Sequence, residues 1–279
     1  MKLKLLFILL TISFNLKSQN QRFLYEYKSV SDSLNPENIE SEIMALDVTV
    51  KFSKFYSYDN FKFDSISKSN VDKGISDSNL KIKKSKNLSI VIKEYPEFSV
   101  LMISRIGQIK YNVKDGRILK WKISPENDVF GNFKIQKAES EFAGREWTAW
   151  FTTEIPIQEG PYKFRGLPGL ILKIYDSTNS HIFTLAGIQK LKKVSSKDDN
   201  FVFDFGTNQN LTQEKYKQIF NEFRNDPNKS IRQTLSEMDE VNDNGKMVNK
   251  NDYLREREKR LKEEIKKSNN LLELDLIKS

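Results

Sequence analysis

The stretch that decides the fold is Met44-Ala45-Leu46-Asp47-Val48-Thr49-Val50-Lys51-Phe52. Every second side chain from Met44 to Phe52 is apolar, and most of the side chains between them are polar or charged. Side chains alternate between the two faces of a β-strand, so this period of two predicts a strand with one face in a core and the other in water. Such a strand needs neighbours with the same pattern.

Similar alternation returns along much of the chain and predicts an all-antiparallel arrangement. Further strands are expected at 23–27, 88–92, 100–106, 109–113, 119–123, 133–138, 145–151, 170–175, 182–188 and 201–205. Lys114-Asp115-Gly116 predicts a tight hairpin turn, and residues 176–180 predict a longer one. Sequential strands without helices between them favour an antiparallel meander that forms a curved sheet or an open barrel. We therefore expect a mainly β fold.

Two segments depart from this alternation. Residues 65–87 are rich in Ser, Lys, Asp and Asn, which indicates a long solvated loop or an insertion. After residue 205 the apolar period becomes helical, with Thr212 as the expected N-cap and Asp226-Pro227 as the stop. The apolar face of this helix would be made by Tyr216, Ile219, Phe220 and Phe223.

A second C-terminal helix is expected from Asn251. Glu256, Glu258 and Glu263 each precede a basic residue by four positions, an order that stabilises a helix. Because the segment is polar on all sides, we expect a loosely attached helix; the alternative is a tail that lies on a partner or on an anionic surface. The chain thus divides into a signal peptide at 1–18, an antiparallel β domain at 19–206, and a helical segment with a charged tail at 207–279.

Residues 1–18 have the pattern of an export signal. Lys2 and Lys4 precede an apolar run that ends at Leu16. This run is too short to cross roughly 30 Å of hydrocarbon as a helix, so we expect cleavage after Ser18 rather than a permanent anchor. The mature chain would then lack a transmembrane segment and be periplasmic or extracellular. A buried N-terminal helix is the alternative.

Composition narrows the classes of function. The chain has no cysteine, so the fold must stand without disulfides in a compartment that would allow them. Its formal net charge is +8, spread as lysine along the chain, which favours solubility over a nucleic-acid partner. With one histidine and no cysteine, neither a transition-metal site nor a cofactor is expected.

No catalytic constellation is visible in the sequence. The single histidine, His181, falls at a predicted hairpin, where we expect it to be solvated. A nucleophile elbow, a phosphate-binding glycine loop and a His-Glu-x-x-His motif are all absent. Pairs of carboxylates, Glu139 with Glu141 and Glu146 with Glu154, leave a carboxylate-based hydrolase as an alternative function.

Glycine, proline and tryptophan concentrate between residues 131 and 187. The hexapeptide Gly166-Leu167-Pro168-Gly169-Leu170-Ile171 suits a type II turn, because Pro168 presets φ and Gly169 accepts a positive φ. Gly160-Pro161 predicts a second bend. Residues 157–166 would therefore form a short loop that is held at both ends.

These residues resemble the GLPGLI family of exported envelope proteins, which is named for the hexapeptide at 166–171. Gly-Arg-x-Trp at 144–147, Glu-Ile-Pro-Ile at 154–157 and Gly-Pro-x-Lys-Phe at 160–164 carry the resemblance further, and it covers roughly residues 121–188. Members of the family are of unknown biochemical function. The resemblance therefore implies export but no particular activity.

The segment also suggests where a partner would bind. The loop at 157–166 is either a structural corner of the curved sheet or a preorganised binding rim. Alternation in strand 145–151 separates Trp147, expected in the core, from Trp150, expected to line a concave surface; the alternative is that helices or the tail cover Trp150. The predicted binding residues are Arg145, Trp150, Tyr162, Lys163 and Arg165.

The function expected from this sequence is that of a non-catalytic binding module. Its ligand would be an apolar small molecule or another envelope protein, held against the concave face of the sheet. A structural subunit that docks through its basic tail is a further alternative.

Overall fold

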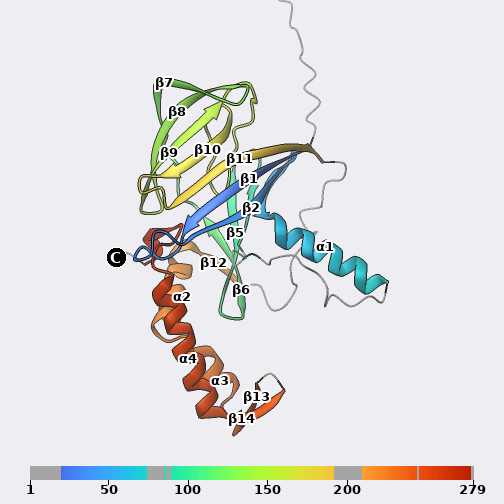
Figure 1. Cartoon of the computed structure of the whole chain (residues 1–279), viewed down its shortest axis with the longest axis vertical. Coiled ribbons are helices and arrows are strands. Elements are labelled where there is room, and N and C mark those ends of the chain that lie inside the picture. Colours follow the sequence, from blue (N-terminus) through green and yellow to red (C-terminus); the bar gives the residue numbers. More distant parts are fainter. Residues whose placement is uncertain (1–19, 74–84, 86–88, 192–208, 244, 278–279) are drawn as a thin grey trace, which may run out of the picture.

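A computed structural model describes residues 20–73, 85, 89–191, 209–243 and 245–277 (Figure 1). The expected signal peptide at 1–18 and the expected strand at 201–205 lie outside the described residues. None of the described helices is long and apolar enough to span a membrane.

Most of the described chain forms one open, twelve-stranded sheet. Its strands are β1 (Gln21–Val30), β2 (Ile39–Val48), β3 (Phe52–Ser57), β4 (Ile90–Glu94), β5 (Ser99–Ile106), β6 (Ile109–Asp115), β7 (Lys122–Phe130), β8 (Phe133–Phe142), β9 (Arg145–Thr152), β10 (Leu170–Asp176), β11 (His181–Lys190) and β12 (Gln209–Thr212). Strands β1 to β6 form one meander and β7 to β11 a second, and the two join where β1 pairs with β11. The short β12 adds to β6 in parallel. The expected mainly β, antiparallel fold is confirmed.

The stretch 44–52 is not a single strand. β2 ends at Val48, and the hydroxyl of Thr49 accepts hydrogen bonds from the backbone N–H groups of Lys51 and Phe52, which turns the chain into β3. Val50 is exposed at this turn. The side-chain hydrogen bonds of Thr49 thus override the apolar alternation.

The predicted hairpin at 114–116 is wrong, whereas the one at 176–180 is confirmed. β10 and β11 pair across residues 176–180. By contrast, β6 and β7 lie toward opposite edges of the sheet, and the chain crosses between them after Asp115. The carboxylate of Asp115 is buried and binds Lys163 and Arg117. Asp115 therefore forms an ion-pair contact in the interior instead of a hairpin turn.

Part of the expected loop at 65–87 is helical. Helix α1 (Tyr58–Asp72) lies beside β2 and β3 (Figure 1). Its Phe61 ring packs at a tilt against the ring of Tyr56, and the guanidinium of Arg22 lies over both rings. This aromatic contact anchors a helix that its polar composition did not predict.

The C-terminal elements form an arm that points away from the sheet (Figure 1). The arm contains α2 (Gln213–Asn225), α3 (Lys229–Thr234), the hairpin β13 (Glu240–Asp243) and β14 (Lys246–Asn249), and α4 (Lys250–Lys267). The expected cap is confirmed, because the hydroxyl of Thr212 accepts a hydrogen bond from the N–H of Lys215. α4 contains no buried residue, in keeping with its polarity. The chain then returns to the sheet.

The face of the sheet that bears Trp147 holds the core, and we call it the inner face. Two irregular segments cover it: residues 153–169, which contain the glycine-proline corner, and residues 269–276, which we call the strap. The 3₁₀ turn η2 (Leu274–Leu276) ends the strap. The most deeply buried large side chains of this core are Phe23, Tyr25, Phe55, Trp147, Phe151, Phe164 and Phe183.

Candidate functional site

The glycines of the corner allow the backbone to approach the sheet closely. Gly169 does not adopt a positive φ, so the predicted type II turn is wrong. A Cβ at Gly169 would instead lie 1.9 Å from the carbonyl oxygen of Thr152. A Cβ at Gly160 would lie 2.7 Å from the Cδ1 atom of Ile171. Close packing, and not a type II turn, therefore explains the glycine at position 169. Leu167 and Leu170 of the same hexapeptide are buried in the core.

The loop at 157–166 is held at both ends, as expected. The N–H of Gly166 donates to the carbonyl of Gln158 (3.1 Å), and the N–H of Ile171 donates to the carbonyl of Glu159 (3.0 Å). Its side chains, however, do not all project: Tyr162 and Lys163 are buried. They turn inward because the interior supplies charged partners for both.

A buried lysine of the sheet fixes the base of this loop. Lys93 in β4 pairs with the carboxylate of Glu159 and donates to the carbonyl of Gly160 (2.9 Å). Glu159 also accepts hydrogen bonds from the hydroxyls of Ser53 (3.0 Å) and Tyr95 (2.6 Å). Burial lowers the pKa of Lys93 and raises that of Tyr95, whose pKa the charge of Glu159 raises further. The loop is thus attached through polar contacts inside the core.

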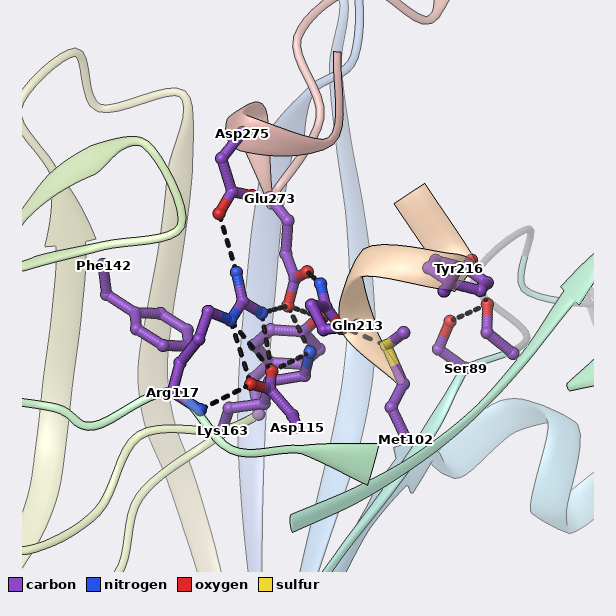
Figure 2. A network of polar contacts seen from close by, with 12 residues as sticks. Ser89, Met102, Asp115, Arg117, Phe142, Lys163, Gln213, Tyr216, Glu273 and Asp275 are labelled. Carbon is purple, nitrogen blue, oxygen red and sulfur yellow. Dashed lines mark hydrogen bonds and ion pairs between the residues drawn. The ribbon is translucent and has the colours of Figure 1, made fainter. Parts of the chain in front are cut away.

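The carboxylate of Glu273, in the strap, is the centre of a second buried network (Figure 2). Lys163 forms an ion pair with it, Tyr162 donates its hydroxyl proton to it (2.7 Å), and Arg117 donates from Nη2 (2.9 Å). Gln213 donates to its other oxygen (2.9 Å). Burial alone would raise the pKa of Glu273, but the charges of Lys163 and Arg117 outweigh it and hold that pKa below its usual value.

Asp115 neutralises the same two cations from the side of the sheet. Its carboxylate lies 2.7 Å from the Nζ atom of Lys163 and 2.6 Å from the Nη2 atom of Arg117. Burial would raise the pKa of Asp115, but hydrogen bonds and charge from these two residues lower it well below its ordinary range. Arg117 reaches Asp275 of the strap as well (2.8 Å). The network therefore joins the loop, the end of β6 and the strap.

Arg145 holds the first part of the strap. Its guanidinium donates to the side-chain oxygen of Asn270 (2.6 Å) and to the carbonyl of Leu271 (3.0 Å), and it pairs with the buried Asp176 (2.9 Å). The preceding Gly144 has a φ of +77°, and a Cβ there would lie 2.9 Å from the backbone nitrogen of Asp275. Both residues of this motif therefore serve the strap.

His181 is buried, so the expectation of a solvated hairpin position is wrong. One ring nitrogen lies 2.7 Å from the hydroxyl of Tyr27, and the other lies 3.0 Å from the carbonyl of Asn270. Burial, and then the nearby positive charge of Arg145, lower the pKa of His181 to about 4. The imidazole is thus a neutral link between β1 and the strap.

This burial predicts a loss of stability in weak acid. The unfolded chain takes up a proton on His181 near its ordinary pKa of 6.5, whereas the folded chain takes it up only near pH 4. The stability contributed by the neutral ring is therefore complete above pH 6.5 and falls by about 3 kcal/mol as the pH drops toward 4. Urea unfolding of the wild type and of His181→Gln between pH 7 and 4.5 measures this; parallel curves would contradict it.

The structure brings three predicted binding residues together and separates two. Arg145, Tyr162 and Lys163 converge on the strap. Trp147 is in the core, as expected, while Trp150 is half-buried on the opposite face, where Lys137 and Lys173 are its cross-strand neighbours.

The remaining predicted residue, Arg165, is half-buried, and its guanidinium lies 5.9 Å from the ring centre of Phe98. A role of these residues toward an external ligand stays a prediction. Sequence reasoning did not find Arg117, Asp115, Gln213 or Glu273, because no motif marks them.

The carboxylates considered for hydrolysis do not form a cleft. Glu139, Glu141, Glu146 and Glu154 are exposed, and Glu141 lies opposite Glu146 in the β8–β9 pair. Within the described ranges, no group of three or more His, Asp or Glu residues is placed to hold a metal ion.

The comparisons with known proteins give a family-model match over part of the chain and a similar fold. Residues 119–173 match a family model described as "Protein of unknown function (Porph_ging)". The match contains the motif stretches from Gly144 to Ile171. No curated protein matches the chain.

Solved structures of PNGF-II share the fold. The P21 crystal form gives a TM-score of 0.51 and the C2 form 0.50, each at 13% identity over 74% of this chain. The alignment spans 34% of the PNGF-II chain, so the aligned part of this chain corresponds to about a third of that protein. At this identity the likeness concerns the β-rich fold alone.

Proposed function

We propose that this chain is an exported binding module of the GLPGLI type, and that its motif residues build a groove for an extended segment of an envelope protein. In the structure the strap fills this groove. The observation that carries the proposal is that two separate motifs bind the strap: Arg145 from the motif at 144–147, and Tyr162 and Lys163 from the motif at 160–164.

The charges of the groove define what an occupant must carry. Lys163 and Arg117 bring two positive charges, and Asp115 supplies one negative charge on the sheet side. A buried ion that loses its partner costs several kcal/mol, so the groove requires a carboxylate from whatever fills it. Leu271, Leu272 and Leu276 flank Glu273 and pack on the core. An acidic segment flanked by leucines therefore fits.

The apolar-ligand and hydrolase alternatives have less support. An apolar ligand was expected on the face that bears Trp150, but Trp150 is half-buried there and has Lys137 and Lys173 as cross-strand neighbours. A carboxylate-based hydrolase needs an acid whose pKa is raised. In the described residues the buried Asp115 and Glu273 have lowered pKa values instead.

A synthetic peptide tests the proposal. A fluorescent peptide with the sequence of residues 268–277 is titrated into the whole chain carrying Glu273→Gln, whose own strap is weakened. Because hydrogen bonds to a charged group contribute about 1.5–3 kcal/mol, we expect this peptide to bind about tenfold or more tightly than the same peptide with Gln at position 273. It should also bind the variant more tightly than the wild type, in which the strap competes.

Two controls sharpen the measurement. Lys137→Gln changes a half-buried lysine of β8 that pairs with Glu126 and Glu139, away from the strap, and should leave peptide affinity unchanged. Arg145→Gln removes the donors to Asn270 and Leu271 and should weaken binding. Equal affinity of the two peptides for the Glu273→Gln chain would refute the proposed groove.

A further inference from the structure

The segment that demonstrably fits the groove is the strap, and a second copy of the chain carries the same segment. We infer that the strap exchanges between two copies, so that Glu273 of each copy fills the groove of the other. This inference rests on the proposed function and names the partner as another molecule of the same chain.

The strap contacts the sheet, the loop and α2, and it contacts the preceding helix α4 through a hydrogen bond from Asn269 to the carbonyl of Lys266 (3.1 Å). Asn269 accepts a hydrogen bond from the hydroxyl of Ser33 (2.7 Å) and donates to Asp32 (2.8 Å). Asn270 donates to the carbonyl of Val30 (2.8 Å). At the other end, the N–H of Asp275 donates to the carbonyl of Ala143 (3.2 Å). All these contacts would form equally with a strap from another copy.

The connection to the strap can change its path at small cost. α4 contains no buried residue, and polar contacts hold it to α2 and to the segment that follows α2. Arg224 donates to the carbonyl of Ser268 (3.0 Å), and Arg257 donates to the carbonyl of Pro227 (2.8 Å). By contrast, Tyr216 of α2 is buried and bonds Ser104 of β5, so α2 stays with its own sheet. The element that would exchange is α4 together with the strap.

Exchange leaves no charge uncompensated and no groove open. Each Lys163–Arg117 pair again receives one Glu273 carboxylate, and a two-fold arrangement closes after two copies. A tethered strap competes with an effective concentration of about a millimolar, so the exchanged dimer should grow with chain concentration. The groove also selects for the strap backbone, because Gly144 admits Asp275 at a distance that a side chain would block.

Single cysteines report which copy a strap occupies. The chain has no cysteine, so Ser33→Cys and Asn269→Cys each introduce one thiol at positions whose side chains touch. The two variants, carrying different affinity tags, are unfolded together in urea, refolded at increasing concentration up to about 1 mM, and oxidised. A disulfide between the two variants can form specifically when the strap of one lies in the groove of the other.

We expect this mixed disulfide to increase with concentration and to fall about tenfold when the Asn269→Cys chain also carries Glu273→Gln. The double variant with both cysteines should form an intramolecular disulfide at low concentration, which verifies the geometry. Lys137→Cys, at a half-buried position away from the strap, should not pair specifically with Asn269→Cys. If the double variant closes internally but the mixture gives no mixed disulfide above the Lys137→Cys background, exchange is refuted, while peptide binding would still support the groove.

Discussion

Glu273→Gln is expected to lower the free energy of unfolding by about 3 kcal/mol. The substitution keeps the volume of the side chain but removes its charge. Lys163 is 1% exposed, and with Arg117 it would then share the single carboxylate of Asp115 in the buried part of the network. An excess positive charge in a site from which water is excluded accounts for the size of the effect.

Urea unfolding at neutral pH measures the loss. Asp275→Asn is the matched control, because it removes another strap carboxylate that contacts the same Arg117 but is more than a third exposed. Solvent screens that pair, so its removal should cost less than about 1 kcal/mol. Equal effects of the two substitutions would show that Glu273 is not the residue that neutralises the groove.

The strands of the sheet could be predicted from the sequence because the apolar alternation that marks each strand lies in neighbouring residues. Strand β9 needs one face in the core, and the alternation of Trp147, Ala149 and Phe151 records this in neighbouring residues. The pairing of β1 with β11 could not be predicted in the same way. It joins residues more than 150 positions apart, such as Tyr27 and Phe183, and no local pattern selects that partner among twelve similar strands.

The site was predicted in part for the same reason. Lys163 and Arg145 lie in glycine-rich motifs, so they were found, but as residues of an exposed rim. Their inward direction depends on Glu273 and Asn270, which follow the polar helix α4 and carry no motif of their own. A charged residue inside a rigid loop is therefore a sign of a distant counter-charge. Its direction cannot be predicted until that partner is known.

Gly169→Ala is expected to cost about 3 kcal/mol or more, or to abolish folding. An added Cβ would lie 1.9 Å from the carbonyl oxygen of Thr152 and 2.6 Å from its carbon, both atoms of the strand backbone. Backbone atoms cannot rotate away as a flexible side chain can. The corner would have to lift from β9, which would expose Leu167 and Leu170 from the core.

Thermal and urea unfolding of Gly169→Ala, compared with Gly116→Ala, measure this effect. Gly116 lies in the crossover after β6, its φ is not positive, and a Cβ there meets no atom within 4 Å. Its replacement should change stability by less than about 0.5 kcal/mol. A mild effect at Gly169 would mean that the hexapeptide is not kept by close packing against β9. The presence of glycine at position 169 would then have another explanation, such as contact with a bound partner.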